Sequence, residues 1–282
     1  MGRIWDGGDV AQELLERVRE EVILLEREGR LPPALAAIMV GESPSDERIQ
    51  VLQADACRVT GVSYQVYSFS QRCDHQSILR TLDKLNADPA VTGIAIHALP
   101  STYLRELAAA IAPEKDIDGL HPLHLGRFVT NKRVRRHPRG ADIVQLLQRT
   151  GQTLVGAHVI CIGNVSGLAG ILAWLCLHEN ATVSAWRDTT TRPLHMLHQG
   201  DILIIDTDDL PIADGAGLKP GVVVVDARSR PDGWMHCQPA DLPEAVALLI
   251  PVPGGMGPMT IAMRLASLVA MYRASASVLL DP

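Results

Sequence analysis

Hydrophobic and polar positions along the chain follow two different periods. In residues 9–28, apolar side chains such as Val10, Leu14, Val18 and Val22 recur at three- and four-residue intervals, which is typical of an amphipathic helix. Helices are predicted over residues 9–28, 46–60, 76–86, 104–111 and 140–150, from the turn at 163–170 to 178, and over 261–272. Short apolar or alternating runs predict strands over residues 34–40, 62–69, 91–96, 157–162, 181–186, 201–205 and 221–225.

Strands and helices alternate throughout this pattern. Such an order is typical of an α/β fold, in which a parallel sheet carries helices on both faces. A polar, turn-rich segment over residues 113–122 interrupts the alternation and marks a boundary between two domains. The length of 282 residues suits two domains of about 100–150 residues each.

The composition indicates a globular protein, with 47% hydrophobic and 21% charged residues. A net charge of -6 and an aromatic content of 4% argue against nucleic-acid partners. The five cysteines form no C-x-x-C pair, and Cys161 and Cys176 lie in apolar runs, which favours a reducing compartment. The N-terminus lacks a signal pattern and no apolar run has the length of a membrane span, so we expect a cytoplasmic protein without a membrane partner.

A glycine-rich turn follows the predicted strand 157–162 and precedes a helix. Its glycines are Gly163, Gly167 and Gly170, and free N–H groups at such a helix start attract phosphate. Asp188 follows roughly 20 residues later, where an acidic residue accepts hydrogen bonds from a ribose. The spacing differs from G-x-G-x-x-G, so two alternatives stay open. The turn binds a dinucleotide, or its glycines only allow the helix to pack closely on the strand.

Two groups of polar residues follow the predicted domain boundary. Residues 127–139 are strongly basic and form either a solvated loop or a patch that faces an anion. His121, His124 and His137 have no recognisable ligand spacing, so no metal site is expected.

The segment 251–260 reads P-V-P-G-G-M-G-P-M-T and contains three prolines and three glycines. It excludes a helix or an interior strand, because proline lacks an N–H donor and fixes φ. Glycine lets the backbone approach a ligand closely. The segment is either an ordinary tight turn or the wall of a ligand site, and we expect Thr260 to cap the helix that follows.

Three motifs together resemble the methylenetetrahydrofolate dehydrogenase/cyclohydrolase family. They are the segment 251–260, E-K-D-I-D-G over residues 114–119, and V-G-E-S-P-S over residues 40–45. The resemblance covers essentially the whole chain. It implies two α/β domains that flank a cleft, a folate-type domain over 1–120 and a Rossmann-like NAD(P)-type domain over 121–257. The last helix, 258–282, would return to the first domain. The resemblance also implies a homodimer formed through the Rossmann-like domains.

The resemblance assigns candidate site residues, and the chain departs from the family at several of them. Asp118 would accept hydrogen bonds from the pterin ring of a tetrahydrofolate derivative, although it also suits a turn cap. The places of a catalytic Tyr and Lys hold Ile49 and Gln53, and glutamine exchanges no proton near neutral pH. His97 replaces a glutamine at the end of a strand, where it is either an acid–base group or a hydrogen-bonded core histidine. The implied catalytic residues are His97, Gln53 and Asp118, and the implied folate-binding residues are Ile49, Asp118, Pro251, Pro253, Gly254, Gly255, Pro258 and Thr260.

For the cofactor, NADP or NAD, the resemblance assigns residues around the glycine-rich turn and after the next strand. These are Gly163, Asn164, Val165, Ser166, Arg187 and Asp188. The turn lacks the Arg and Ser with which the family holds phosphate. Asp206, Asp208 and Asp209 would repel a phosphate-bearing cofactor.

Three functions fit these residues. The first is NAD(P)-dependent oxidation of 5,10-methylenetetrahydrofolate without cyclohydrolase activity, because hydride transfer needs positioning more than an acid–base group. The second is a folate-binding relative that has lost the cofactor and performs other one-carbon chemistry or none. The third is a structural or regulatory partner of a family member. We favour the first.

Overall fold

The computed structural model divides the chain into two compact units, which are described separately. The three-stranded unit comprises residues 10–138 and 261–282, and the six-stranded unit comprises residues 1–9 and 139–260. The structure describes residues 2–5, 7–41, 44–70, 72–97, 101–130, 138–164, 168–187, 193–207, 217–227, 243–251 and 256–278.

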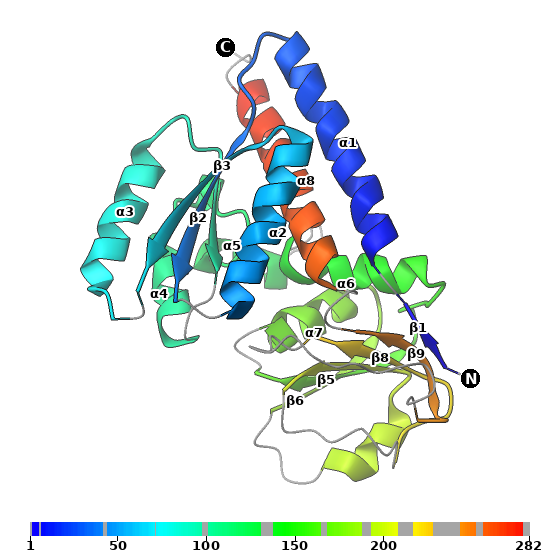
Figure 1. Ribbon diagram of the computed structural model, residues 1–282. Helices are drawn as coiled ribbons and strands as arrows, with labels where there is room; N and C mark the ends of the chain where they lie inside the picture. Colours follow the sequence, from blue (N-terminus) through cyan, green and yellow to red (C-terminus); the bar gives the residue numbers. More distant parts are fainter. Residues whose placement is uncertain are drawn as a thin grey trace. The chain divides into compact units, whose positions relative to one another are not determined.

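The three-stranded unit is built on a parallel sheet in the order β3-β2-β4 (Figure 1). Its strands are β2 (Ala34–Val40), β3 (Ser63–Phe69) and β4 (Gly93–His97). Its helices are α1 (Gly8–Arg27), α2 (Pro44–Thr60), α3 (His75–Ala87), α4 (Ser101–Ala110), the short η1 (Pro113–Lys115), α5 (Pro122–Thr130) and most of α8 (Met256–Val278).

Helices cover both faces of this sheet because β2 and β4 are buried and largely apolar on both faces. Ala36, Ile38 and Val40 of β2 pack in one cluster with α3 and α4. Leu35, which points to the opposite face, packs with α1, α2 and α8. Figure 1 shows the same division, with α3 and α4 on one side and α1, α2 and α8 on the other.

The six-stranded unit contains a parallel sheet in the order β1-β9-β8-β7-β5-β6. Its elements are β1 (Arg3–Ile4), α6 (Pro138–Arg149), β5 (His158–Gly163), α7 (Leu168–His178), β6 (Thr182–Trp186), the short η2 (Pro193–Gln199), β7 (Ile202–Asp206), β8 (Val222–Asp226) and β9 (Val246–Ile250). Ile160 and Ile162 of β5 pack with Leu197 of η2 on one face. Cys161 points to the other face, where it lies close to Cys176 of α7.

The α/β class with two units of parallel sheet confirms the predicted fold class. The predicted helices and strands are present, most with ends shifted by a few residues, but several elements were not predicted. No element was predicted for residues 246–250, which form the strand β9 between β1 and β8. The strand β1 and the helix α5 were not foreseen either.

The domain boundaries also differ from the predicted ones. Residues 1–9 belong to the six-stranded unit because β1 pairs with β9. Residues 121–138 belong to the three-stranded unit rather than to the Rossmann-like one. Asp116 holds this segment by accepting hydrogen bonds from the His121 N–H at 2.7 Å and from the His124 ring at 3.0 Å. The chain enters the three-stranded unit again at residue 261, inside α8.

The start of α8 corrects the expected role of Thr260. The helix begins at Met256, so Thr260 lies inside it and does not cap it. Pro258 falls in the first turn, where the missing N–H of proline breaks no helical hydrogen bond. Among the described helices, none is both long enough and apolar enough to span a membrane.

Candidate functional site

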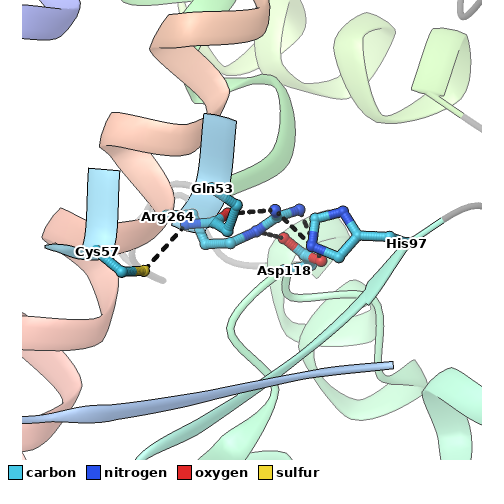
Figure 2. A network of polar contacts seen from close by, with 5 residues as sticks. All are labelled: Gln53, Cys57, His97, Asp118 and Arg264. Atoms are coloured by element: carbon cyan, nitrogen blue, oxygen red, sulfur yellow. Dashed lines mark hydrogen bonds and ion pairs between the residues drawn. The ribbon is translucent and has the colours of Figure 1, made fainter. Parts of the chain in front are cut away.

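A buried polar network lies inside the three-stranded unit (Figure 2). It joins Gln53 of α2, His97 at the end of β4, Asp118 after η1, and Arg264 of α8. These residues are only 0%, 6%, 4% and 6% exposed, respectively. Burying a polar side chain costs folding free energy unless its hydrogen bonds are made. The hydrogen bonds among these four residues offset that cost.

Arg264 and Asp118 form a two-pronged ion pair. The Nε of Arg264 donates to Oδ1 of Asp118 at 2.9 Å, and Nη2 donates to Oδ2 at 3.2 Å. This side-by-side geometry is the strongest form of an arginine–carboxylate contact. Both oxygens of Asp118 are therefore engaged by one guanidinium group.

The remaining nitrogen of the guanidinium binds the two other network members. Nη1 of Arg264 donates to Oε1 of Gln53 at 3.0 Å and lies 3.2 Å from Nε2 of His97. Because a guanidinium only donates, the contact with His97 requires an unprotonated Nε2. Arg264 is thus clamped by side chains from α2 and β4 as well as by Asp118.

Two further polar groups border the network. Nε2 of Gln53 donates to Sγ of Cys57 at 3.6 Å, one helical turn further along α2. Burial raises the pKa of the Cys57 thiol to about 11, although the Gln53 hydrogen bond and the Arg264 charge act in the opposite direction. Burial also raises the pKa of Tyr64 to about 12, and its buried hydroxyl has no hydrogen-bond partner among the described residues.

Local structure explains how residues distant in sequence meet here. The segment before Asp118 runs beside β4, since the Ile117 N–H donates to the Ile94 carbonyl and Ile94 bridges to Asp116. This brings Asp118 to the side of the strand that ends in His97. On α8, Arg264 lies on the same helical stripe as the buried residues Ile261, Leu265 and Leu268, which are three or four residues apart.

In the six-stranded unit, the last residue of β5, Gly163, lies beside the last residue of β7, Asp206. Gly163 has a φ of +146°, and a Cβ there would come within 2.4 Å of the Asp206 carbonyl oxygen, so only glycine fits. Oδ2 of Asp206 accepts a hydrogen bond from the N–H of Ala169 at 3.3 Å. Ala169 is the second residue of α7, so the carboxylate lies at the positive end of that helix.

Comparison with known proteins adds a family to this geometry. Residues 5–118 match the model of the tetrahydrofolate dehydrogenase/cyclohydrolase catalytic domain, and residues 138–276 match that of the family's NAD(P)-binding domain. The bifunctional protein FolD of Geobacillus kaustophilus is 30% identical over 96% of this chain and 97% of its own length. The chain belongs to the tetrahydrofolate dehydrogenase/cyclohydrolase family.

Two further relatives agree with this assignment. The bifunctional protein FolD of Methanospirillum hungatei is 33% identical over 92% of this chain and 93% of its own. The crystal structure of the bifunctional FolD enzyme from Campylobacter jejuni superposes with a TM-score of 0.85 at 26% identity, covering 98% of this chain and all of the other. The predicted family is therefore confirmed.

The structure brings together three of the residues that the family resemblance singled out. His97, Gln53 and Asp118 meet in the network, whereas Ile49 lies one turn earlier on α2, 40% exposed and outside it. Arg264 was missed, although a cation on the buried stripe of a helix signals a buried acidic partner.

The other predicted site residues lie in the six-stranded unit or outside the described residues. Pro251, Pro258 and Thr260 belong to the six-stranded unit, as do Gly163, Asn164 and Arg187, of which the last two are exposed. The predicted residues outside the described part of the chain are Val165, Ser166, Asp188, Pro253, Gly254 and Gly255.

Two other features bear on the location of a site: the placement of metal-ligating side chains and a cavity. In the part of the chain that the structure describes, no group of three or more His, Cys, Asp or Glu side chains is placed to hold a metal ion. A cavity of about 360 Å³ in the six-stranded unit is lined by Asp201, Lys219 and neighbouring residues. It lies at the amino ends of β7 and β8, whereas ligands of open parallel sheets bind at the carboxyl ends.

Proposed function

We propose that this chain binds a tetrahydrofolate derivative at the Asp118 network and oxidises 5,10-methylenetetrahydrofolate with NAD or NADP, without the cyclohydrolase step. Family membership supports the substrate class and the cofactor class. The name of the Campylobacter jejuni enzyme gives both activities to that protein. Gln53 is the residue that separates the two activities in this chain.

The single observation that carries the proposal is that both polar atoms of the Gln53 amide are hydrogen-bonded within the network. Its amide oxygen accepts from Arg264 and its amide nitrogen donates to Cys57. An amide has no proton to exchange near neutral pH, and hydrolysis of a methenyl bridge needs a group that activates water. Arg264 supplies a positive charge in the same place but remains protonated, so it stabilises charge without transferring a proton.

His97 is the remaining candidate for proton transfer. Its Nε2 faces Nη1 of Arg264, so a proton added there would point at a cation. We therefore assign His97 an acceptor role that orients Arg264. Hydride transfer depends chiefly on holding the methylene carbon against the nicotinamide. It therefore does not require a proton-transferring side chain in this network.

Several features of the six-stranded unit suit a bound dinucleotide. Its parallel sheet, the close approach at Gly163 and the start of a helix after β5 are features of dinucleotide sites. In this proposal, Gly163 and Asn164 border the phosphates and Arg187 follows the next strand. When bound, the nicotinamide supplies the hydride acceptor.

One observation favours a second candidate function, a folate-binding relative without a cofactor. The carboxylate of Asp206 already lies at the start of α7, where a dinucleotide phosphate would approach. Two negative groups at one helix start repel each other. A protein of this second kind would bind folate but not reduce NAD or NADP.

The test measures the oxidation step and the hydrolysis step separately. Purified protein is mixed with 5,10-methylenetetrahydrofolate and NAD or NADP, and reduced cofactor is followed by its absorbance. Separately, 5,10-methenyltetrahydrofolate is added alone and its hydrolysis is compared with the rate in buffer. We expect cofactor reduction and no acceleration of hydrolysis. Folate binding without reduction would replace the first proposal by the second, and enzyme-driven hydrolysis would contradict the role of Gln53.

We further propose a homodimer that forms through the six-stranded unit. The strand β6 lies at one edge of its sheet, and the adjoining helix α7 exposes Trp174 and Leu177, each to 41%. An exposed edge strand beside apolar side chains suits pairing with a second copy. Light scattering should give twice the chain mass, and Trp174→Lys should lower it towards a monomer.

A further inference from the structure

Arg264 reproduces the hydrogen-bonding pattern of the ligand that the proposed function assigns to Asp118. An aminopyrimidine ring presents a ring N–H and an amino N–H side by side, as a cyclic form of guanidine. Arg264 presents Nε–H and Nη2–H to the two oxygens of Asp118 at 2.9 and 3.2 Å. The ring and the side chain therefore need the same pair of acceptor positions.

The surroundings of Asp118 leave little room for both partners. Asp118 is 4% exposed, and Arg264 beside it is 6% exposed. A carboxylate does have further lone pairs, but those that point forward from the group are taken by the guanidinium fork. A ring that binds Asp118 by two hydrogen bonds must first displace that fork.

We propose that Arg264 is a specificity-determining residue that competes with the aminopyrimidine edge of the substrate for Asp118. This inference rests on the proposed function, in which Asp118 binds that edge. Gln53 and His97 strengthen the competition, because both contact Nη1 and hold the guanidinium over the carboxylate. Substrate binds only in the state where Arg264 has left Asp118, and the cost of that step lowers the apparent affinity.

A purely structural ion pair makes the opposite prediction. If Arg264 only stabilised the core, its removal would loosen the site and weaken the binding of any ligand. If Arg264 competes for Asp118, its removal strengthens binding even though the free protein becomes less stable. The two roles therefore differ in the sign of the change in affinity.

The experiment measures the dissociation constants of two probes by calorimetry on the full-length chain. The probes are tetrahydrofolate, kept reduced under anaerobic conditions, and the fragment 2-amino-4-hydroxypyrimidine. The variants are Arg264→Met and Arg264→Met with Asp118→Asn. The matched control is Arg273→Met, which removes another arginine of α8 whose partner is Glu21 at 2.7 Å. Arg264→Lys is added because it keeps the buried charge but loses the fork.

We expect Arg264→Met to bind both probes at least tenfold more tightly than the wild type, and Arg264→Lys to bind them a few-fold more tightly. Asp118→Asn should abolish the gain, and Arg273→Met should leave both constants unchanged. Equal or weaker binding by both folded Arg264 variants, with tetrahydrofolate still bound by the wild type, would overturn the competition but not the proposed function. Failure of every variant to bind tetrahydrofolate would overturn both. If Arg264→Met does not fold, the sign of the change in Arg264→Lys decides.

Discussion

Asp118 in the three-stranded unit and Asp206 in the six-stranded unit are both carboxylates where the family resemblance expects a ligand, but their surroundings differ. Asp118 is almost fully buried and paired with a guanidinium. Asp206 is half-buried and accepts a hydrogen bond from the start of α7. One acid is neutralised by a cation, whereas the other adds negative charge to a natural anion site. In our proposal, the first therefore governs access for a cationic or donor-rich ligand, and the second governs access for phosphate.

The largest effect should come from breaking the buried pair. Arg264→Met leaves Asp118 as a buried carboxylate without its cation, which typically costs about 3–5 kcal/mol of unfolding free energy. Urea unfolding followed by circular dichroism measures the loss. Arg273→Met should cost less than about 1 kcal/mol, because the pair of Arg273 with Glu21 is partly exposed. Equal losses in the two variants would show that burial of the Asp118 pair does not increase its contribution to the unfolding free energy.

A second change tests whether the network lacks only an acid–base group for the hydrolysis step. Gln53→Lys combined with Arg264→Met places a titratable amine beside Asp118, and we expect hydrolysis of 5,10-methenyltetrahydrofolate to rise about a hundredfold, as is typical of a restored acid–base group. Gln53→Met in the same background is the control. The single variant Gln53→Lys should gain less, because its amine would face Nη1 of Arg264. If the double variant hydrolyses no faster than its control, Gln53 is not what suppresses this activity.

At the other carboxylate, Asp206→Asn removes the charge while keeping an acceptor for the Ala169 N–H. We expect the dissociation constant for NADP to fall about tenfold, which corresponds to about 1.4 kcal/mol. The gain should shrink as salt is added, because salt screens the repulsion. Asp201→Asn, at the opposite end of β7, is the control and should not change cofactor affinity. An unchanged constant in Asp206→Asn would remove the argument for a cofactor-free relative.

The smallest effect should come from an exposed pair. The His158 N–H and the Lys219 ammonium lower the pKa of the Asp201 carboxyl. A lowered pKa in the folded state adds stability above the unfolded value, and this stability is lost as pH falls through the folded value. The side chains of Lys219 and Asp201 are 43% and 41% exposed, so the pair should contribute less than about 1 kcal/mol. Asp201→Asn should therefore be slightly less stable than the wild type at pH 7, with the difference vanishing on acidification, as measured by urea unfolding.

Much of the fold followed from periodicity alone, and the exceptions have physical causes. The strand β2 was predicted with its observed ends, because it lies between β3 and β4 and is apolar throughout. The strand β9 also lies between two strands, yet its five residues directly follow an acidic segment. A short apolar run of this kind fits a helix end as well as a strand. The strand β1 has two residues and carries no periodicity at all.

The candidate site was only partly predictable for a different reason. Gln53, His97 and Asp118 stood out because they fall on family motifs or replace family residues. Arg264 lies in a helix whose apolar pattern was read as core packing, and its partner Asp118 is 146 positions earlier in the chain. The pattern places Arg264 on the buried stripe but does not say which acid it meets. That pairing is decided by tertiary structure.

The division of the chain also has a consequence for its synthesis on the ribosome. The strand β1 (Arg3–Ile4) is made long before its partner β9 (Val246–Ile250). The core of the three-stranded unit likewise includes Leu265 and Leu268 of α8, made on the order of ten seconds after residue 138. Neither unit can finish folding before β9 and α8 have been made. Until then, the apolar surface that α8 will cover is open to chaperones, and premature termination before residue 261 should leave a product marked for degradation.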